Sequence, residues 1–228
     1  DAESESSLPG IEARIEGETA TGDADTDNAY DFAGDTYDYF WSAHGRNSYD
    51  DAGAALISTV HFCPETEAGS GIYDCPYANA FWNGTFLVFG DGDNQTFSNL
   101  AASLDITAHE IQHGVTEFTA GLIYENQSGA LNEAYSDIFA CMVDRDDWTV
   151  GEDVTLVSPG FLRDLAHPEN GLDPLPTKMS EYRNMPVDQD HGGVHINSGI
   201  ANYAFYKFTE NLGFNKDKAP EETVSLNG

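Results

Sequence analysis

The residues best suited to chemistry form the run His109-Glu110-Ile111-Gln112-His113. Two histidines four residues apart project from one face of a helix about one turn apart, so both imidazoles can bind one metal ion. Neutral imidazole is a common zinc ligand, and a catalytic zinc keeps one coordination position for water. Glu110 lies beside both histidines and could act as a general base toward that water. The alternative is an ordinary helix with two partly exposed histidines, because so short a pattern also arises by chance.

A second acidic pair can supply the third metal ligand. Glu133 and Asp137 are also four residues apart, so both carboxylates face the same side of a helix. One of them can bind the metal, while the other can accept a hydrogen bond from a ligand histidine and fix its tautomer. A solvated carboxylate is the alternative for Glu133 alone, but it does not explain an acidic pair within an otherwise apolar segment.

Helices are predicted to carry both motifs. Apolar residues recur at three- and four-residue steps around each of them, and the same pattern occurs near both ends of the chain. Gly45 is a plausible C-terminal stop for the first helix, and Ser128-Gly129 precedes the third. The predicted helices cover residues 23–44, 104–119, 130–143 and 198–212.

Strands and loops fill the remaining sequence. Residues 55–62 and 84–90 are rich in β-branched and aromatic side chains, which predicts two strands. Pro, Gly and Asp are frequent over 151–193, which predicts a long loop.

Three motifs, in order and at matching spacing, resemble the thermolysin-like zinc metallopeptidases. They are HEIQH, GLIYENQSGALNEAYSD and GGVHINSGIANYAFY, and the resemblance covers about residues 22–212. It implies an α+β, two-lobe catalytic domain with the zinc-binding helix between an α/β N-terminal lobe and a mainly helical C-terminal lobe. The implied parts are an acidic tail or lost strand over 1–21, the first lobe over 22–119 and the second over 120–228.

The resemblance also implies roles for individual residues. It places zinc (Zn²⁺) on His109, His113 and Glu133, with Glu110 as the base. A carbonyl attacked by water develops negative charge on its oxygen, so hydrogen-bond donors beside that oxygen accelerate the reaction. The implied supporting residues are Asn132 and Asp137, which orient His113 and His109; Tyr124 and His195, which stabilise the oxyanion; and Asp190, which orients His195. The other histidines, without such context, are interpreted as structural or surface residues: His44, His61, His167 and His191.

Substrate-binding residues follow from the same resemblance. Arg163 corresponds to an arginine that binds a substrate carbonyl, and Asn79, Ala80 and Trp82 belong to an edge strand that holds the peptide. Scattered apolar residues match a pocket for a bulky apolar side chain after the cut bond, although core packing would also explain them. They are Phe97, Leu100, Ile106, Val150, Val154 and Leu162.

A calcium site is implied near the start of the zinc-binding helix. The residues that match the family's calcium cluster are Asp105, Asp144, Asp147 and Glu152, and Ca²⁺ prefers several carboxylate oxygens. The loop between Asp144 and Asp147 is shorter than usual in the family, and Thr149 replaces an acid. One calcium ion is therefore expected instead of a pair.

Composition limits the classes of partner and compartment. The 228 residues include 40 acidic and 9 basic side chains, a formal charge of -31, which disfavours nucleic acid and anionic membrane surfaces as partners.

A local disulfide between Cys63 and Cys75 would suit an oxidising compartment, although two unpaired thiols are the alternative. Cys141 is expected to be a buried thiol. No signal peptide is visible, and both ends are shorter than the family pattern, so a cleaved propeptide or further parts of a longer chain are expected partners.

The sequence therefore predicts a secreted zinc endopeptidase acting on peptide or protein substrates. An exopeptidase with the same zinc site is one alternative, but no charged group that would close the cleft is identified. A non-catalytic acidic calcium-binding module, or an inactive fragment, is the other. Glu110 and His195 argue against it, because such a module needs neither.

The acidic excess predicts that salt stabilises the fold. Repulsion between like charges weakens as the Debye length falls from about 30 Å at 0.01 M to about 3 Å at 1 M salt. We expect the melting temperature to rise with NaCl over this range at a fixed, saturating calcium concentration. A flat or falling melting temperature would contradict this interpretation of the acidic surface.

Overall fold

Helix α1 (Ala24–His44) begins and ends at residues that the sequence marks. The computed structural model describes residues 8–65 and 72–212. The side chain of Asp23 accepts a hydrogen bond from the Thr26 amide, and Gly45 takes the left-handed conformation at φ 64°. Parts of three predicted features lie outside the described residues: 1–7 of the acidic tail, 66–71 of the loop between the cysteines, and 213–228 of the helical lobe.

A small sheet lies beside α1, in the strand order β1-β3-β2. Strand β1 (Ser58–Thr59) pairs parallel with β3 (Leu87–Phe89), and β2 (Ala80–Trp82) pairs antiparallel with β3. All three residues of β3 are buried, whereas β2 lies at the sheet edge and is half-buried.

Both predicted strands are shorter in the structure than the sequence indicates. Residues 55–62 pair only at Ser58–Thr59, because His61 takes a left-handed conformation at φ 57° that interrupts extended backbone. Single backbone hydrogen bonds still link Leu87 to Ile57 and Phe62 to Phe89 on either side of the paired residues.

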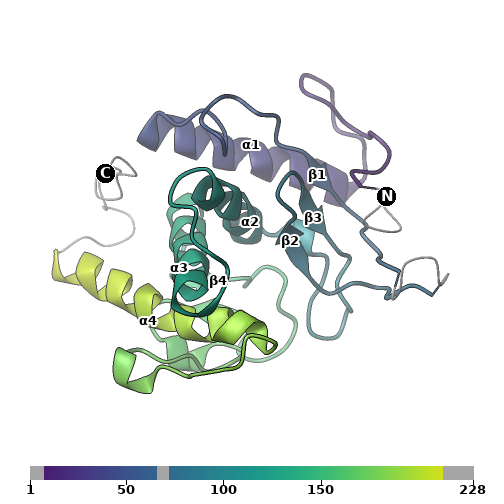
Figure 1. Ribbon diagram of the computed structural model, residues 1–228. Coiled ribbons are helices and arrows are strands. Elements are labelled where there is room, and N and C mark those ends of the chain that lie inside the picture. Colours follow the sequence, from purple (N-terminus) through teal and green to yellow (C-terminus); the bar gives the residue numbers. More distant parts are fainter. Residues whose placement is uncertain (1–7, 66–71, 213–228) are drawn as a thin grey trace.

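Two central helices, α2 (Leu104–Glu117) and α3 (Asn126–Val143), pack against each other between the two sides of the molecule (Figure 1). Helix α1 and the sheet lie on one side, and α4 (Asp190–Asn211) lies on the other. One apolar cluster joins α1, β3 and the central helices through Phe40, Phe89, Ile111 and Phe139.

Helix α3 begins four residues before its predicted start. The sequence suggests that Ser128-Gly129 precedes the helix, but Gly129 lies within its first turns. A side chain at Gly129 would place a Cβ 2.4 Å from Cγ1 of Val194 on α4. This glycine therefore permits a close approach of two helices and does not mark a helix start.

The long loop and the last helix also differ from their predicted bounds. Short elements interrupt the loop: β4 (Thr149–Val150) pairs antiparallel with β5 (Arg163–Asp164), and two 3₁₀ turns follow, η3 (Pro168–Asn170) and η4 (Met179–Glu181). A third 3₁₀ turn, η2 (Leu100–Ala102), precedes α2. The backbone takes the left-handed conformation at four successive residues, 190–193. Regular helix in α4 therefore starts at Val194, before the predicted start at Ser198.

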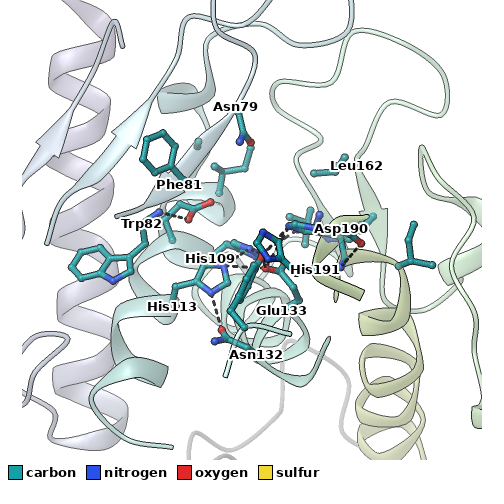
Figure 2. Close-up of a pocket in the computed structure, with 18 of the residues that line it drawn as sticks. Asn79, Phe81, Trp82, His109, His113, Asn132, Glu133, Leu162, Asp190 and His191 are labelled. Carbon is teal, nitrogen blue, oxygen red and sulfur yellow. Dashed lines mark hydrogen bonds and ion pairs between the residues drawn. The ribbon is translucent and has the colours of Figure 1, made fainter. Parts of the chain in front are cut away.

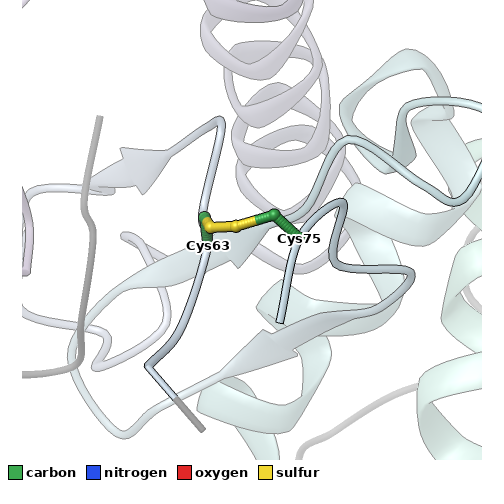
Figure 3. The surroundings of a disulfide bond; sticks show 2 residues. All are labelled: Cys63 and Cys75. Atoms are coloured by element: carbon green, nitrogen blue, oxygen red, sulfur yellow. A yellow bond between two sulfur atoms is a disulfide. The ribbon is translucent and has the colours of Figure 1, made fainter. Parts of the chain in front are cut away.

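The cysteines behave as the sequence predicts. Cys63 and Cys75 form a disulfide that closes the loop before β2 (Figure 3), and Cys141 is a buried cysteine outside that disulfide. Among the described residues, no helix combines the length and apolar character needed to cross a membrane.

One histidine, His61, joins three acidic side chains near the start of α1. Its Nδ1 lies 2.7 Å from Asp91 Oδ1, its Nε2 lies 3.4 Å from Asp23 Oδ2, and its Nδ1 lies 3.9 Å from Asp25 Oδ2. Burial acts to lower the pKa of His61, but the three carboxylates outweigh it and raise that pKa. The imidazolium therefore fastens the first turn of α1 to the loops that follow β1 and β3.

This cluster predicts a pH-dependent contribution to stability. Because the folded pKa of His61 is raised, its contribution is full below the unfolded value of about 6.5 and is lost as pH rises through the folded pKa. We expect His61→Gln to lower the melting temperature by roughly 2–4 °C at pH 6, for about 1 kcal/mol, and by less at pH 9.

His167→Gln is the matched control, since His167 is exposed and its Nδ1 lies 3.9 Å from the exposed carboxylate of Glu169. An equal loss for His61→Gln at both pH values would show that its charge contributes nothing.

Candidate active site

Three side chains from α2 and α3 converge in the way the zinc prediction requires. His109 Nε2 lies 3.1 Å from His113 Nε2, and each lies 3.4 Å from an oxygen of Glu133 (Figure 2). Glu133 is buried, and its Oε2 has no hydrogen-bond partner among the described residues. A buried carboxylate oxygen facing two imidazole nitrogens suits a divalent cation, so these three residues fit zinc.

The other ring nitrogen of each histidine is held by a neighbour on α3. His113 Nδ1 lies 2.8 Å from Asn132 Oδ1, and His109 Nδ1 lies 2.9 Å from Asp137 Oδ1. A proton on each Nδ1 leaves the Nε2 lone pairs directed toward Glu133. Both histidines are therefore oriented to bind a metal through Nε2.

Asp137 also binds the arginine that the sequence assigns to substrate. Arg163 on β5 donates from Nε to Asp137 Oδ2 at 2.8 Å and from Nη2 to Oδ1 at 2.6 Å. Burial would raise the pKa of Asp137, but Arg163 and His109 outweigh it and bring that pKa to about 2. The Asp137 carboxylate thus stays charged and joins a zinc-ligand histidine to Arg163.

The edge strand is fastened to α2 through Trp82. Its backbone amide donates to Glu110 Oε2 at 2.9 Å, and its indole Nε1 donates to Glu117 Oε2 at 3.1 Å. Glu110 is buried and lines the same cavity as His109. The structure therefore places the expected base and the expected substrate strand in direct contact.

The opposite wall comes from the start of α4 and the loop before α3. His195 Nδ1 lies 2.5 Å from Asp190 Oδ1, and His195 Nε2 lies 3.2 Å from the Tyr124 hydroxyl, which also donates to Glu133. Burial and the Glu133 charge raise the pKa of Tyr124, so its hydroxyl remains a donor. A side chain at Gly192 would place a Cβ 2.3 Å from Asn126 Oδ1, so this left-handed turn needs glycine.

These walls enclose a cavity of about 1050 Å³. Expected substrate residues from three parts of the chain line it: Asn79, Ala80, Trp82, Phe97, Leu100, Ile106, Val150, Leu162 and Arg163. Val154 differs from this expectation, because it is fully buried in the apolar core and does not line the cavity. Gly151, at φ 83°, turns the chain between Val150, which lines the cavity, and Val154, which does not.

Sequence reasoning missed three residues at the site. His191 lines the cavity, with its ring 5.3 Å from that of Tyr124. Ser136 lies 3.2 Å from His113 Nδ1, and its helical spacing from Asn132 could have indicated this. Asn202 on α4 contacts Asp137, and no local pattern connects the two.

The four expected calcium ligands lie near one another but are less convergent than the zinc ligands. No three of them bring one oxygen each within 4.8 Å of one another. Burial and the nearby Asp105 and Asp147 raise the pKa of Glu152 to about 7; burial, with a smaller effect of Asp144, raises the pKa of Asp105. Glu152 Oε2 is buried without a hydrogen-bond partner among the described residues. The charges repel, as expected where a cation can bind.

Comparison with known proteins agrees with this geometry. Residues 15–117 match thermolysin metallopeptidase, catalytic domain, and residues 120–225 match thermolysin metallopeptidase, alpha-helical domain. The structure of the precursor of protealysin, a metalloproteinase from Serratia proteamaculans, superposes with a TM-score of 0.80 at 37% identity. That match covers 97% of this chain and 73% of the other.

Two curated relatives extend the comparison. An extracellular metalloprotease of Pectobacterium carotovorum subsp. carotovorum is 44% identical over 93% of this chain, and the neutral protease NprE of Bacillus pumilus is 47% identical over 81%. The chain spans 63% and 58% of their lengths. The predicted α+β fold is confirmed. With both family domains matched and the His109, His113 and Glu133 zinc-binding group in place, the chain belongs to the thermolysin metallopeptidase family.

Proposed function

We propose that this chain is a secreted zinc endopeptidase that hydrolyses internal peptide bonds of protein substrates. One observation carries the proposal: a candidate base, Glu110, and two candidate oxyanion donors, Tyr124 and His195, line the same cavity as the zinc-binding group. Extracellular location is supported by the name of the Pectobacterium relative and by the disulfide. A propeptide or further parts of a longer chain remain proposed partners, whereas nucleic acid and membrane do not.

The proposed chemistry divides among the walls of the cavity. Zinc held by His109, His113 and Glu133 would supply Lewis-acid activation of a carbonyl oxygen and of water. Glu110, held by the Trp82 amide, accepts a proton from the attacking water and returns it to the leaving amine.

Stabilisation of the developing oxyanion is assigned to the opposite wall. The Tyr124 hydroxyl and the His195 imidazole are 3.2 Å apart, so both can donate to one substrate oxygen. Each such donor contributes about 3–4 kcal/mol to transition-state stabilisation. Asp190 holds the His195 ring so that Nε2 points toward Tyr124 and Glu133.

Substrate binding is proposed to use the sheet edge and the apolar pocket. An extended peptide can pair with β2 because that strand has a free edge among the described strands, and Asn79 precedes it. Arg163 would bind a substrate carbonyl beside the cut bond. A bulky apolar residue after that bond would fit against Phe97, Leu100 and Leu162, which line the cavity.

We also propose that Asp105, Asp144, Asp147 and Glu152 bind calcium. Two observations support a cation there: Glu152 Oε2 is buried with no hydrogen-bond partner among the described residues, and burial raises the pKa of Asp105. A calcium-binding module without activity is the alternative function, and it would need neither Glu110 nor His195.

The role of Glu110 gives the first test. Glu110→Gln leaves all three zinc ligands intact, so we expect about one zinc per chain and a loss of activity of roughly 10²–10⁴-fold. The measurement is metal content together with cleavage of an internally quenched peptide blocked at both ends, which an exopeptidase cannot cut. Undiminished cleavage by the variant, with normal zinc content, would exclude Glu110 as the base. Calcium without zinc in the wild-type chain would favour the binding module.

The calcium site gives a separate test. Removing calcium from zinc-replete protein should leave the like-charged carboxylates unscreened between α2 and the loop after α3, lowering the melting temperature and increasing self-digestion. Asp147→Asn should reproduce part of this loss, and Asp146→Asn, an adjacent acid outside the proposed site, is the control. If calcium changes neither property, the four carboxylates form only a solvated acidic patch.

A further inference from the structure

Besides Asp190 and His195 in the cavity wall, helix α4 contacts the zinc site from the interior through a buried side chain, Asn202. Its Nδ2 donates to Asp137 Oδ2 at 2.8 Å, although the two residues are 65 positions apart in the sequence. Asn202 is 1% exposed and Asp137 is fully buried. The contact therefore lies in the interior, where a hydrogen bond to a charged oxygen is stronger than at the surface.

The partners of Asp137 show what this contact can do. Oδ1 accepts from His109 Nδ1 at 2.9 Å and from Arg163 Nη2 at 2.6 Å. Oδ2 accepts from Arg163 Nε at 2.8 Å and from Asn202. Among these donors, Asn202 is the one assigned neither to zinc nor to substrate. It therefore gives the carboxylate a donor that does not depend on either role.

The amide oxygen of Asn202 supports the view that this side chain serves Asp137. Its Oδ1 is buried and has no hydrogen-bond partner among the described residues. An unsatisfied buried acceptor costs free energy, and a leucine of similar volume would avoid that cost. The hydrogen bond from Nδ2 to Asp137 therefore explains why this buried position carries a polar side chain.

We propose that Asn202 is a positioning residue for the zinc site, acting through Asp137 on the ring of His109 and on Arg163. The proposal rests on the proposed function for its importance in catalysis, but its effect on zinc binding is independent of peptide cleavage. Loss of the Nδ2 donor leaves Asp137 Oδ2 held by Arg163 alone among these donors, so the carboxylate holds His109 less firmly as a ligand.

The test compares two buried asparagines of α4 by zinc affinity. Asn202→Leu should raise the zinc dissociation constant, measured by chelator competition, about tenfold, the lower end of the effect of outer-shell changes. Asn197→Leu is the matched control, because Asn197 is also buried and bonds to Arg183 and Gly193 but not to Asp137. We expect its zinc dissociation constant to stay within about twofold of wild type.

A double-mutant cycle separates positioning from packing. In an Asp137→Asn background, Asn202→Leu should weaken zinc binding much less, because the carboxylate on which it acts is gone. Asn202→Ala, which also removes the donor without adding a charge, replaces Asn202→Leu if the leucine variant does not fold. Melting temperatures of zinc-saturated samples verify folding.

Two outcomes would overturn the inference: folded Asn202 variants with wild-type zinc affinity, or an equal weakening in the Asp137→Asn background. Cleavage of the blocked peptide distinguishes the two proposals. A wild-type chain that does not cut it would refute the endopeptidase, while a tenfold weaker zinc affinity in Asn202→Leu would still support the positioning role.

Discussion

The largely buried ion pair between Asp137 and Arg163 is the interaction on which the site most depends. Charged side chains that are shielded from water are stable only when they are paired and hydrogen-bonded. Removing one partner leaves the other charge buried without an opposite charge. Asp137 meets this condition with donors from α2, β5 and α4. Three elements distant in the sequence are therefore held at one carboxylate, directly behind a zinc ligand.

The two walls of the cavity are fixed by different physical means. On one wall, the edge strand is bonded to α2 through the Trp82 backbone, so the strand and Glu110 keep their relative positions. On the other wall, a left-handed turn at Gly192 and Gly193 brings Asp190 back onto His195. Helices thus fix the metal ligands, while a sheet edge and a glycine turn shape the space around them.

Carboxylates have two distinct roles in this highly acidic chain. Many acidic residues are exposed and contribute to the formal charge of -31 without a partner in the interior. Buried carboxylates such as Asp137 are saturated with donors. Glu133 and Glu152 instead retain a buried oxygen without a donor among the described residues, and both lie where a cation is expected. The missing donor distinguishes a carboxylate available to a metal from one that serves the fold.

The sequence alone determined what depends on neighbours within a few turns of helix. The four-residue spacing of His109 and His113, and of Glu133 and Asp137, placed each pair on one helix face, and the ends of α1 were readable at Asp23 and Gly45. The full extent of the strands and the start of α3 were predicted wrongly, because a left-handed His61 and a close contact at Gly129 override local propensity. Only the tertiary structure shows that Val154 lies in the apolar core and not at the cavity, and that Asn202 contacts Asp137. The periodicity of the sequence indicates on which side of a helix or strand a residue lies. Which residue it contacts there is decided by packing between segments that are distant in the sequence.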